Sequence, residues 1–190
     1  MKKLWVVAFL ITLGITDSGA EKYRQLSENG GPLSLAIVEA RETREPQTLK
    51  EQTGLGIPLS AMAAGGTYRG PLEQLYSLNP IPLSDSESFL IVKVDVTGVN
   101  KHKLFYLTSD VVLVDKHGAR LTPIGCCPNQ KNGTWLSLKP SQFNPAGGAG
   151  ILEPRQHNVS TLLYKVNTDT IRGGMSIRIQ DAEAAVTASR

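Results

Sequence analysis

The sequence predicts an all-β fold: an immunoglobulin-like antiparallel β-sandwich of about seven or eight strands, with a long Gly/Pro-rich insertion near the N-terminus. From Phe89 onward, short apolar runs recur about every 10 residues, with turn residues between them. No long amphipathic helix interrupts this pattern. A closed barrel has the same spacing, so the sequence leaves that alternative open.

Residues 1–20 have the layout of a cleavable signal peptide. Two lysines follow the initial methionine, an apolar run covers residues 4–15, and the small residues Ser18 and Ala20 stand where a signal peptidase reads. A membrane-spanning helix needs ~20 consecutive apolar residues, which is more than this run offers. We therefore predict bacterial-type export, to the periplasm or the medium, with no stable membrane anchor after cleavage.

Residues 21–182 are predicted to form one β-sandwich domain, long enough for a sizeable core. Its first strand is expected at Leu33–Glu39, after the breaker Gly30-Gly31-Pro32. Residues 54–84 are expected to form a long loop or flap, because five glycines and two prolines fall within residues 54–71.

The second half of the chain carries the clearest strand signals. Phe89–Val96 alternates so that its even-numbered residues, all Leu or Val, share one face. Val159–Val166 and Met175–Ile179 alternate in a similar way. Shorter apolar runs, each expected to form a strand, cover residues 104–107, 111–114, 121–124 and 135–138. Residues 183–190 are mostly small or polar, and we expect them to form a flexible tail.

Three of these segments also suggest a family. Phe89–Val96 (FLIVKVDV), Leu113–Gly118 (LVDKHG) and Leu163–Val166 (LYKV) resemble the DUF4352-type immunoglobulin-like domains of exported bacterial proteins. The resemblance covers about residues 33–181 and implies an extracytoplasmic binding or accessory module, with no catalytic residues to carry over. This chain departs from the family pattern in its 41–84 insertion and in its cysteine pair.

The charge pattern and the motifs argue against several functions. Lys and Arg together number 20 against 17 Asp and Glu, and no run of basic residues is longer than two, whereas nucleic-acid-binding proteins usually carry a clustered basic face. The sequence has no nucleophile elbow, S-x-x-K, H-E-x-x-H or phosphate-binding glycine loop. We therefore predict that the protein is not an enzyme and binds no nucleic acid.

A binding function places the contact residues on loops, since strands mostly serve packing. Aromatic residues and arginine dominate protein contacts, which makes Tyr68, Arg69, Tyr76 and Trp135 the candidate contact residues. Their partner is expected to be another extracytoplasmic protein. The aromatic side chains among them could instead belong to the core.

Cys126 and Cys127 are the only cysteines, and they are adjacent. Export favours a disulfide, but adjacent Cα atoms lie only about 3.8 Å apart, below the ~4.4 Å lower limit of ordinary disulfides. Three interpretations stay open: a strained vicinal disulfide, two reduced thiols, or a Cu or Zn site completed by His117 or His157. A redox-sensitive or soft-metal-handling protein is therefore the alternative to a binding module, and no other cofactor is expected.

Overall fold

The computed structural model describes residues 33–56, 73–98, 104–107, 110–129, 133–139, 149–152 and 157–189. Within these residues the chain is an all-β sandwich with one short helix, α3 (Thr168–Arg172). The strands are β1 (Leu33–Thr43), β2 (Thr48–Gly56), β3 (Glu73–Pro80), β4 (Glu87–Gly98), β5 (Leu104–Leu107), β6 (Val112–Asp115), β7 (Arg120–Leu121), β8 (Gly125–Cys126), β9 (Thr134–Ser137), β10 (Ala149–Leu152), β11 (His157–Asn167), β12 (Met175–Ile179) and β13 (Ala182–Val186). The prediction of an all-β sandwich is confirmed.

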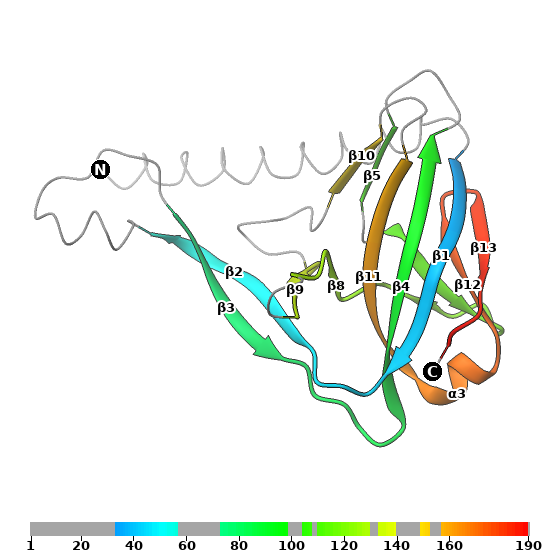
Figure 1. Ribbon diagram of the computed structural model, residues 1–190, viewed down its shortest axis with the longest axis horizontal. Helices are drawn as coiled ribbons and strands as arrows, with labels where there is room; N and C mark the ends of the chain where they lie inside the picture. The colour runs from blue at the N-terminus through cyan, green and yellow to red at the C-terminus, as the bar shows by residue number, and fades with distance from the viewer. Residues whose placement is uncertain are drawn as a thin grey trace, which may run out of the picture.

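Two sheets of unequal width make the sandwich. The larger has seven strands in the order β1-β4-β11-β8-β9-β2-β3, and the smaller has four in the order β13-β12-β6-β7. Strands β5 and β10 form a separate antiparallel pair. The β2–β9 pair is parallel, so the large sheet is not wholly antiparallel as the sequence predicted. Figure 1 shows β2 and β3 extending away from the stacked part of the sandwich.

The main core lies between the two sheets. The alternating valines of β4 direct Val92, Val94 and Val96 inward, where they are fully buried with residues of β6, β11 and β12. Tyr164 on β11 is also fully buried, and its hydroxyl donates a 2.7 Å hydrogen bond to the backbone carbonyl of Val111, next to β6. This bond fastens one sheet to the other.

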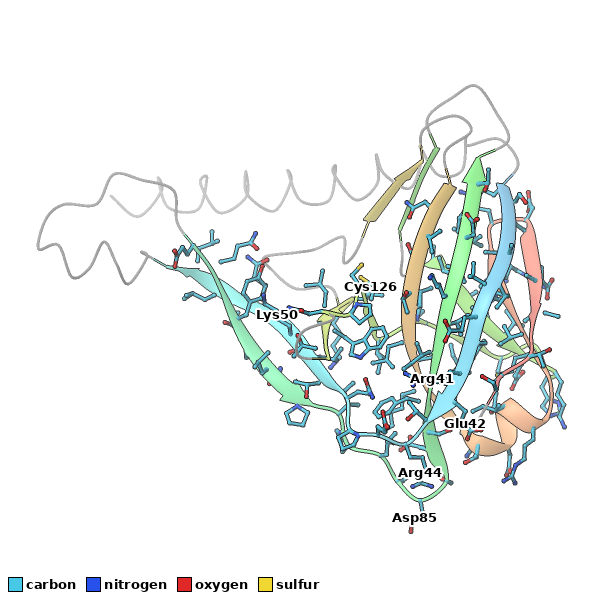
Figure 2. The ribbon with its side chains drawn as sticks, viewed as in Figure 1. Arg41, Glu42, Arg44, Lys50, Asp85 and Cys126 are labelled. Atoms are coloured by element: carbon cyan, nitrogen blue, oxygen red, sulfur yellow. The ribbon has the colours of Figure 1, made fainter. Side chains whose placement is uncertain are left out.

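A smaller apolar cluster covers the opposite face of the large sheet, and its buried members are Leu49, Phe89, Trp135 and Leu163. The segments at residues 44–47 and 81–86 meet beside this cluster. The backbone N–H of Ile81 donates to the carbonyl of Gln47 at 2.9 Å. The Arg44 guanidinium donates to the carbonyls of Asp85 at 2.8 Å and Ser84 at 3.2 Å (Figure 2).

The structure corrects two expectations. The tail expected at residues 183–190 is ordered as far as residue 189, where the described residues end: β13 pairs with β12, Val186 is buried in the core, and the Ser189 N–H donates to the carbonyl of Ala40 at 2.9 Å. Residues 54–84 are not one long loop, because β2 and β3 extend into both ends of that segment. Backbone pairing outweighs the small or polar composition in both places.

Candidate functional site

The β2–β3 hairpin, which we call the arm, continues the core-facing surface of the large sheet. Residues paired directly across neighbouring strands point to the same face. Leu162, buried in the main core, pairs with Cys126, and Cys126 pairs with Leu136 on β9. Lys50 on β2 pairs with Leu136 on one side and with Leu78 of β3 on the other. Leu136 and Leu78 therefore lie on the face that forms the core farther along the sheet.

This face is open at the arm. Leu136, Leu78 and Leu55 are 36%, 60% and 51% exposed, although they share the core-facing side of the sheet. Tyr76 is two residues before Leu78 on β3, so its side chain lies on the same side, and it is 38% exposed. The main core cluster of buried residues includes none from β2, β3 or β9 among those the structure describes. We call Leu55, Tyr76, Leu78 and Leu136 the open face.

Within the described residues, the outer edge of the arm is less protected than the opposite edge of the sheet. Strand β3 is the last strand of its sheet; it starts at the charged Glu73 and ends at Pro80, and the six residues between them carry no charged side chain. Natural edge strands are usually blunted by charges, bulges or a covering segment. The opposite edge strand, β1, has all three: a bulge at Val38, the charged residues Glu39 and Arg41, and the Ser189 segment hydrogen-bonded along it. Among the described residues β3 is therefore the less protected of the two edges of this sheet, and we call it the receptive edge.

Tyr76, a predicted contact residue, is part of the open face. The Lys50 ammonium lies 3.9 Å from the centroid of its ring, and its hydroxyl donates to the Gln74 side chain. This cation–π contact helps to fix the position of the ring, which stays partly exposed. Tyr68 and Arg69, the other candidates from this region, lie outside the described residues.

Trp135 was expected as an exposed contact residue, and the structure corrects this. Its indole is only 3% exposed, because β9 turns it into the smaller apolar cluster. There the indole N–H donates a 2.7 Å hydrogen bond to the Gln47 side-chain oxygen. Sequence reasoning missed Leu55, Leu78 and Leu136 instead. The spacing of Tyr76 and Leu78, two residues apart, is a pattern that predicts a strand with both side chains on one face. The exposure of Leu136, by contrast, follows only from the order of the strands in the sheet.

Both cysteines are free thiols, so the vicinal disulfide is not formed. Cys126 is 2% exposed, on the core-facing side of β8, and Cys127 is exposed just beyond the strand. A hydrogen bond joins the two thiols. It is the main reason why the pKa of Cys127 is lowered to about 7 and the pKa of Cys126 is raised. Figure 2 places Cys126 beside the short β8–β9 pair.

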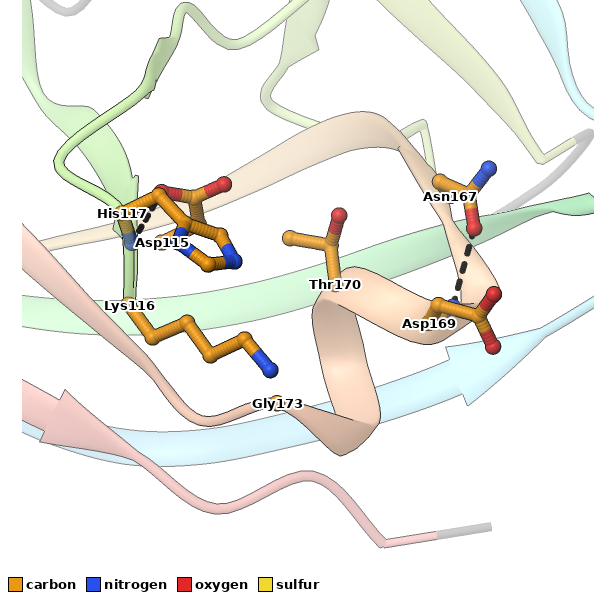
Figure 3. A pocket seen from close by; sticks show the side chains of 7 residues that line it. All are labelled: Asp115, Lys116, His117, Asn167, Asp169, Thr170 and Gly173. Atoms are coloured by element: carbon orange, nitrogen blue, oxygen red, sulfur yellow. Dashed lines mark hydrogen bonds between the residues drawn. The ribbon is translucent and has the colours of Figure 1, made fainter.

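His117 lies in another part of the molecule, in the turn between β6 and β7. It lines a pocket of about 350 Å³ with Asp115, Thr170 and four other residues, Lys116, Asn167, Asp169 and Gly173 (Figure 3). An Asp, a His and a Thr hydroxyl suggest a catalytic triad, but Asp115 does not orient the imidazole. Its Oδ1 accepts the backbone N–H groups of Ala119 and His117, both at 2.8 Å, and these bonds lower the pKa of Asp115. This carboxylate stabilises a turn.

Within the described residues, the structure does not gather Cys126, Cys127 and His117 into a metal site. The pocket that contains His117 includes neither cysteine, and the side chain of His157 is outside the described part of the chain. No group of three or more His, Cys, Asp or Glu side chains within the described ranges could hold a metal ion.

A wider groove of about 530 Å³ crosses the outer face of the large sheet. Glu39, Arg41 and Lys93 line it from β1 and β4, and Trp135 and Thr161 lie among its other lining residues. Because both acidic and basic side chains line it, its charge favours no one class of ligand. Among the helices that the structure describes, none has the length and hydropathy needed to cross a bilayer.

Comparisons with known proteins add fold likenesses only. No protein-family model matches the chain, and no curated protein does. An uncharacterised β-sandwich protein from Clostridium difficile 630 is 7% identical with a TM-score of 0.37, over 80% of this chain and 83% of that one. A functionally unknown protein from Listeria monocytogenes EGD-e is 9% identical with a TM-score of 0.29, over 78% of this chain and 74% of that one. The class of the protein, an all-β sandwich with a projecting arm, rests on its own strand pairing.

Proposed function

We propose that this protein is an exported, non-catalytic binding module that takes up an extended segment of another extracytoplasmic protein along β3. The signal-peptide layout of residues 1–20 and the resemblance to DUF4352-type exported modules support export. The observation that carries binding is the open face at the receptive edge of the sheet.

The chemistry of the edge defines the partner. An added strand would hydrogen-bond to the outward-facing backbone groups of β3, which supply affinity with little regard to sequence. Its side chains would alternate, so every second one would lie beside Tyr76 and Leu78 on the open face. The partner segment is therefore extended, apolar at alternate positions and free of proline within the paired stretch.

The positive charge of Lys50 favours a segment of another protein, rather than an apolar surface such as lipid, as the partner of the open face. Lys50 lies among the apolar residues of that face. The neighbouring carboxylate, Glu51, lies on the opposite face, where it accepts a 2.8 Å hydrogen bond from Asn79. Lys50 lies on β2, across from Leu78 and one strand inward from the edge, so only a long acidic side chain that extends over Leu78 would meet it. This gives the segment a preferred register.

A random peptide library displayed on phage tests the proposal with a defined probe. The full chain is immobilised, and the enriched peptides are synthesised and measured by fluorescence anisotropy. We expect extended sequences with alternating apolar residues. The substitution Leu78→Lys should weaken binding by about tenfold or more, because it places a charge in the apolar contact.

Val38→Lys is the matched control. Val38 is 54% exposed on the protected edge of the same sheet, so the same substitution there should leave binding unchanged. The proposal is wrong if no alternating sequences are enriched, or if peptides bind the Leu78→Lys variant as tightly as the wild-type protein. A concentration-dependent dimer that Leu78→Lys dissolves would also overturn it, because the edge would then pair with a second copy.

A further inference from the structure

We propose that the receptive edge selects a partner segment in which one apolar residue breaks the alternation of the others, and that Leu75 is the residue that sets this preference. The inference rests on the proposed function and deepens it, because it names the sequence pattern that the added strand carries. It concerns the side of the arm opposite the open face. We call this side the reverse face, and Leu75, Ser77 and Asn79 of β3 lie on it.

Leu75 is an apolar side chain that its own sheet leaves uncovered. It pairs directly with Gly54 of β2, which has no side chain, and it belongs to neither of the apolar clusters described above. A Cβ built on Gly56 would lie 3.0 Å from Leu75 Cδ1, so the leucine lies over the backbone of the two glycines. The side chain is still 47% exposed. A strand added along the outer side of β3 would place a side chain directly beside it.

The other residues of β3 on the reverse face are polar. Ser77 pairs with Glu51, and Asn79 donates hydrogen bonds of 2.8 Å to Glu51 and 3.2 Å to Ser77. Lys139 lies 3.7 Å from the same carboxylate. An apolar side chain placed beside Ser77 or Asn79 would cover polar groups, whereas one placed beside Leu75 would cover a leucine. Of the three, Leu75 alone favours an apolar neighbour.

The two faces together define a four-residue motif in the partner segment. The residues beside Leu78 and Tyr76 are apolar because they lie on the open face, and the residue beside Ser77 is polar. The residue beside Leu75 follows directly on the one beside Tyr76, so two consecutive apolar residues occur there. An antiparallel segment reads apolar, polar, apolar, apolar, and a parallel segment reads the reverse order. The order of the motif therefore reports the direction of the added strand.

The test uses a random peptide library displayed on phage, selected in parallel against the full-length wild-type protein and Leu75→Ser. We expect the wild-type protein to enrich the motif, in one order or the other. Leu75→Ser should keep the alternating apolar positions and lose the preference beside residue 75. Val38→Ser is the control, because Val38 is 54% exposed on the protected edge, and this variant should enrich the wild-type motif. Circular dichroism confirms that each variant is folded.

Synthetic peptides measure the same contact by fluorescence anisotropy. In one enriched peptide, the apolar residue assigned to Leu75 is changed to serine. The wild-type protein should bind this peptide about two- to fivefold more weakly than the parent peptide. Leu75→Ser should bind the two peptides equally, because the leucine that the apolar residue covers is absent from this variant.

Failure of this inference and failure of the proposed function give different results. The inference is overturned if enriched peptides alternate but show no apolar preference beside Leu75. It is also overturned if Leu75→Ser enriches the wild-type motif, or if this variant and the wild-type protein lose the same affinity with the serine peptide. The proposed function stands in each of these cases. If no alternating sequences are enriched, the proposed function fails and the inference fails with it.

Discussion

Removing the hydroxyl of Tyr164 is expected to lower the unfolding free energy by more than the loss of one ordinary hydrogen bond would. Tyr164 and Val111 are both fully buried, and the 2.7 Å bond between the hydroxyl and the Val111 carbonyl links the two sheets. Tyr164→Phe keeps the ring but leaves that carbonyl without its side-chain partner, away from water. An abandoned buried polar group costs about 1–3 kcal/mol. For a domain of this size, the corresponding drop in Tm is about 2–4 °C for each kcal/mol.

Urea unfolding followed by tryptophan fluorescence measures the loss of unfolding free energy. Tyr76→Phe is the matched control, because the Tyr76 hydroxyl donates to Gln74 at the surface, where water can replace the bond. That control should change the unfolding free energy by less than about 0.5 kcal/mol. If the two variants lose the same amount, the bond between Tyr164 and Val111 does not hold the sheets together.

Two further predictions follow from local geometry. The Ser84 N–H and the Lys165 ammonium each lie 2.9 Å from the Glu87 carboxylate and lower the pKa of Glu87 to about 2. The ionised Glu87 therefore stabilises the fold above its unfolded pKa of about 4.5, and this stabilisation is lost as the pH falls toward 2. The stability difference between wild-type protein and Glu87→Gln should therefore disappear between about pH 4.5 and 2 in acid titrations of urea unfolding; a constant difference would contradict this. Gly125→Ala should lower the unfolding free energy by about 1–3 kcal/mol, because the new Cβ would lie 2.9 Å from Leu49 Cδ2 and 3.0 Å from Trp135 Cβ. Gly54→Ala, whose Cβ would meet only Leu75 Cδ1 at 3.7 Å, is its control and should cost less than about 0.5 kcal/mol.

The strands that form the core were predictable because their side chains alternate against a single buried face. The even-numbered residues of Phe89–Val96 and the odd-numbered residues of Met175–Ile179 lie inward as that pattern requires. The same logic failed for β13. Its sequence, AEAAV, offers mostly small side chains, and its order comes from pairing with β12 and from the burial of Val186, neither of which the local sequence encodes.

The site was harder to predict than the fold because it depends on sheet order. Tyr76 was chosen as an aromatic contact candidate and does lie on the open face, whereas Trp135 was chosen on the same grounds and is buried. What separates them is the position of each side chain relative to the two faces of the sheet. That position follows from the pairing of β2 with β9 and β3. These strands are far apart in the sequence, so a local sequence pattern does not predict their pairing.

The unequal widths of the two sheets connect the fold to the proposed function. A sheet face stays buried only where another layer covers it. The buried residues of the main core come from β1, β4, β8 and β11 on the large sheet, and the arm lies beyond them in the strand order. Leu162 and Leu78 thus occupy the same face of one sheet, the first fully buried and the second 60% exposed. Since burial is what makes a leucine stabilise the folded chain, Leu78 would gain that contribution only when the proposed partner segment covers it.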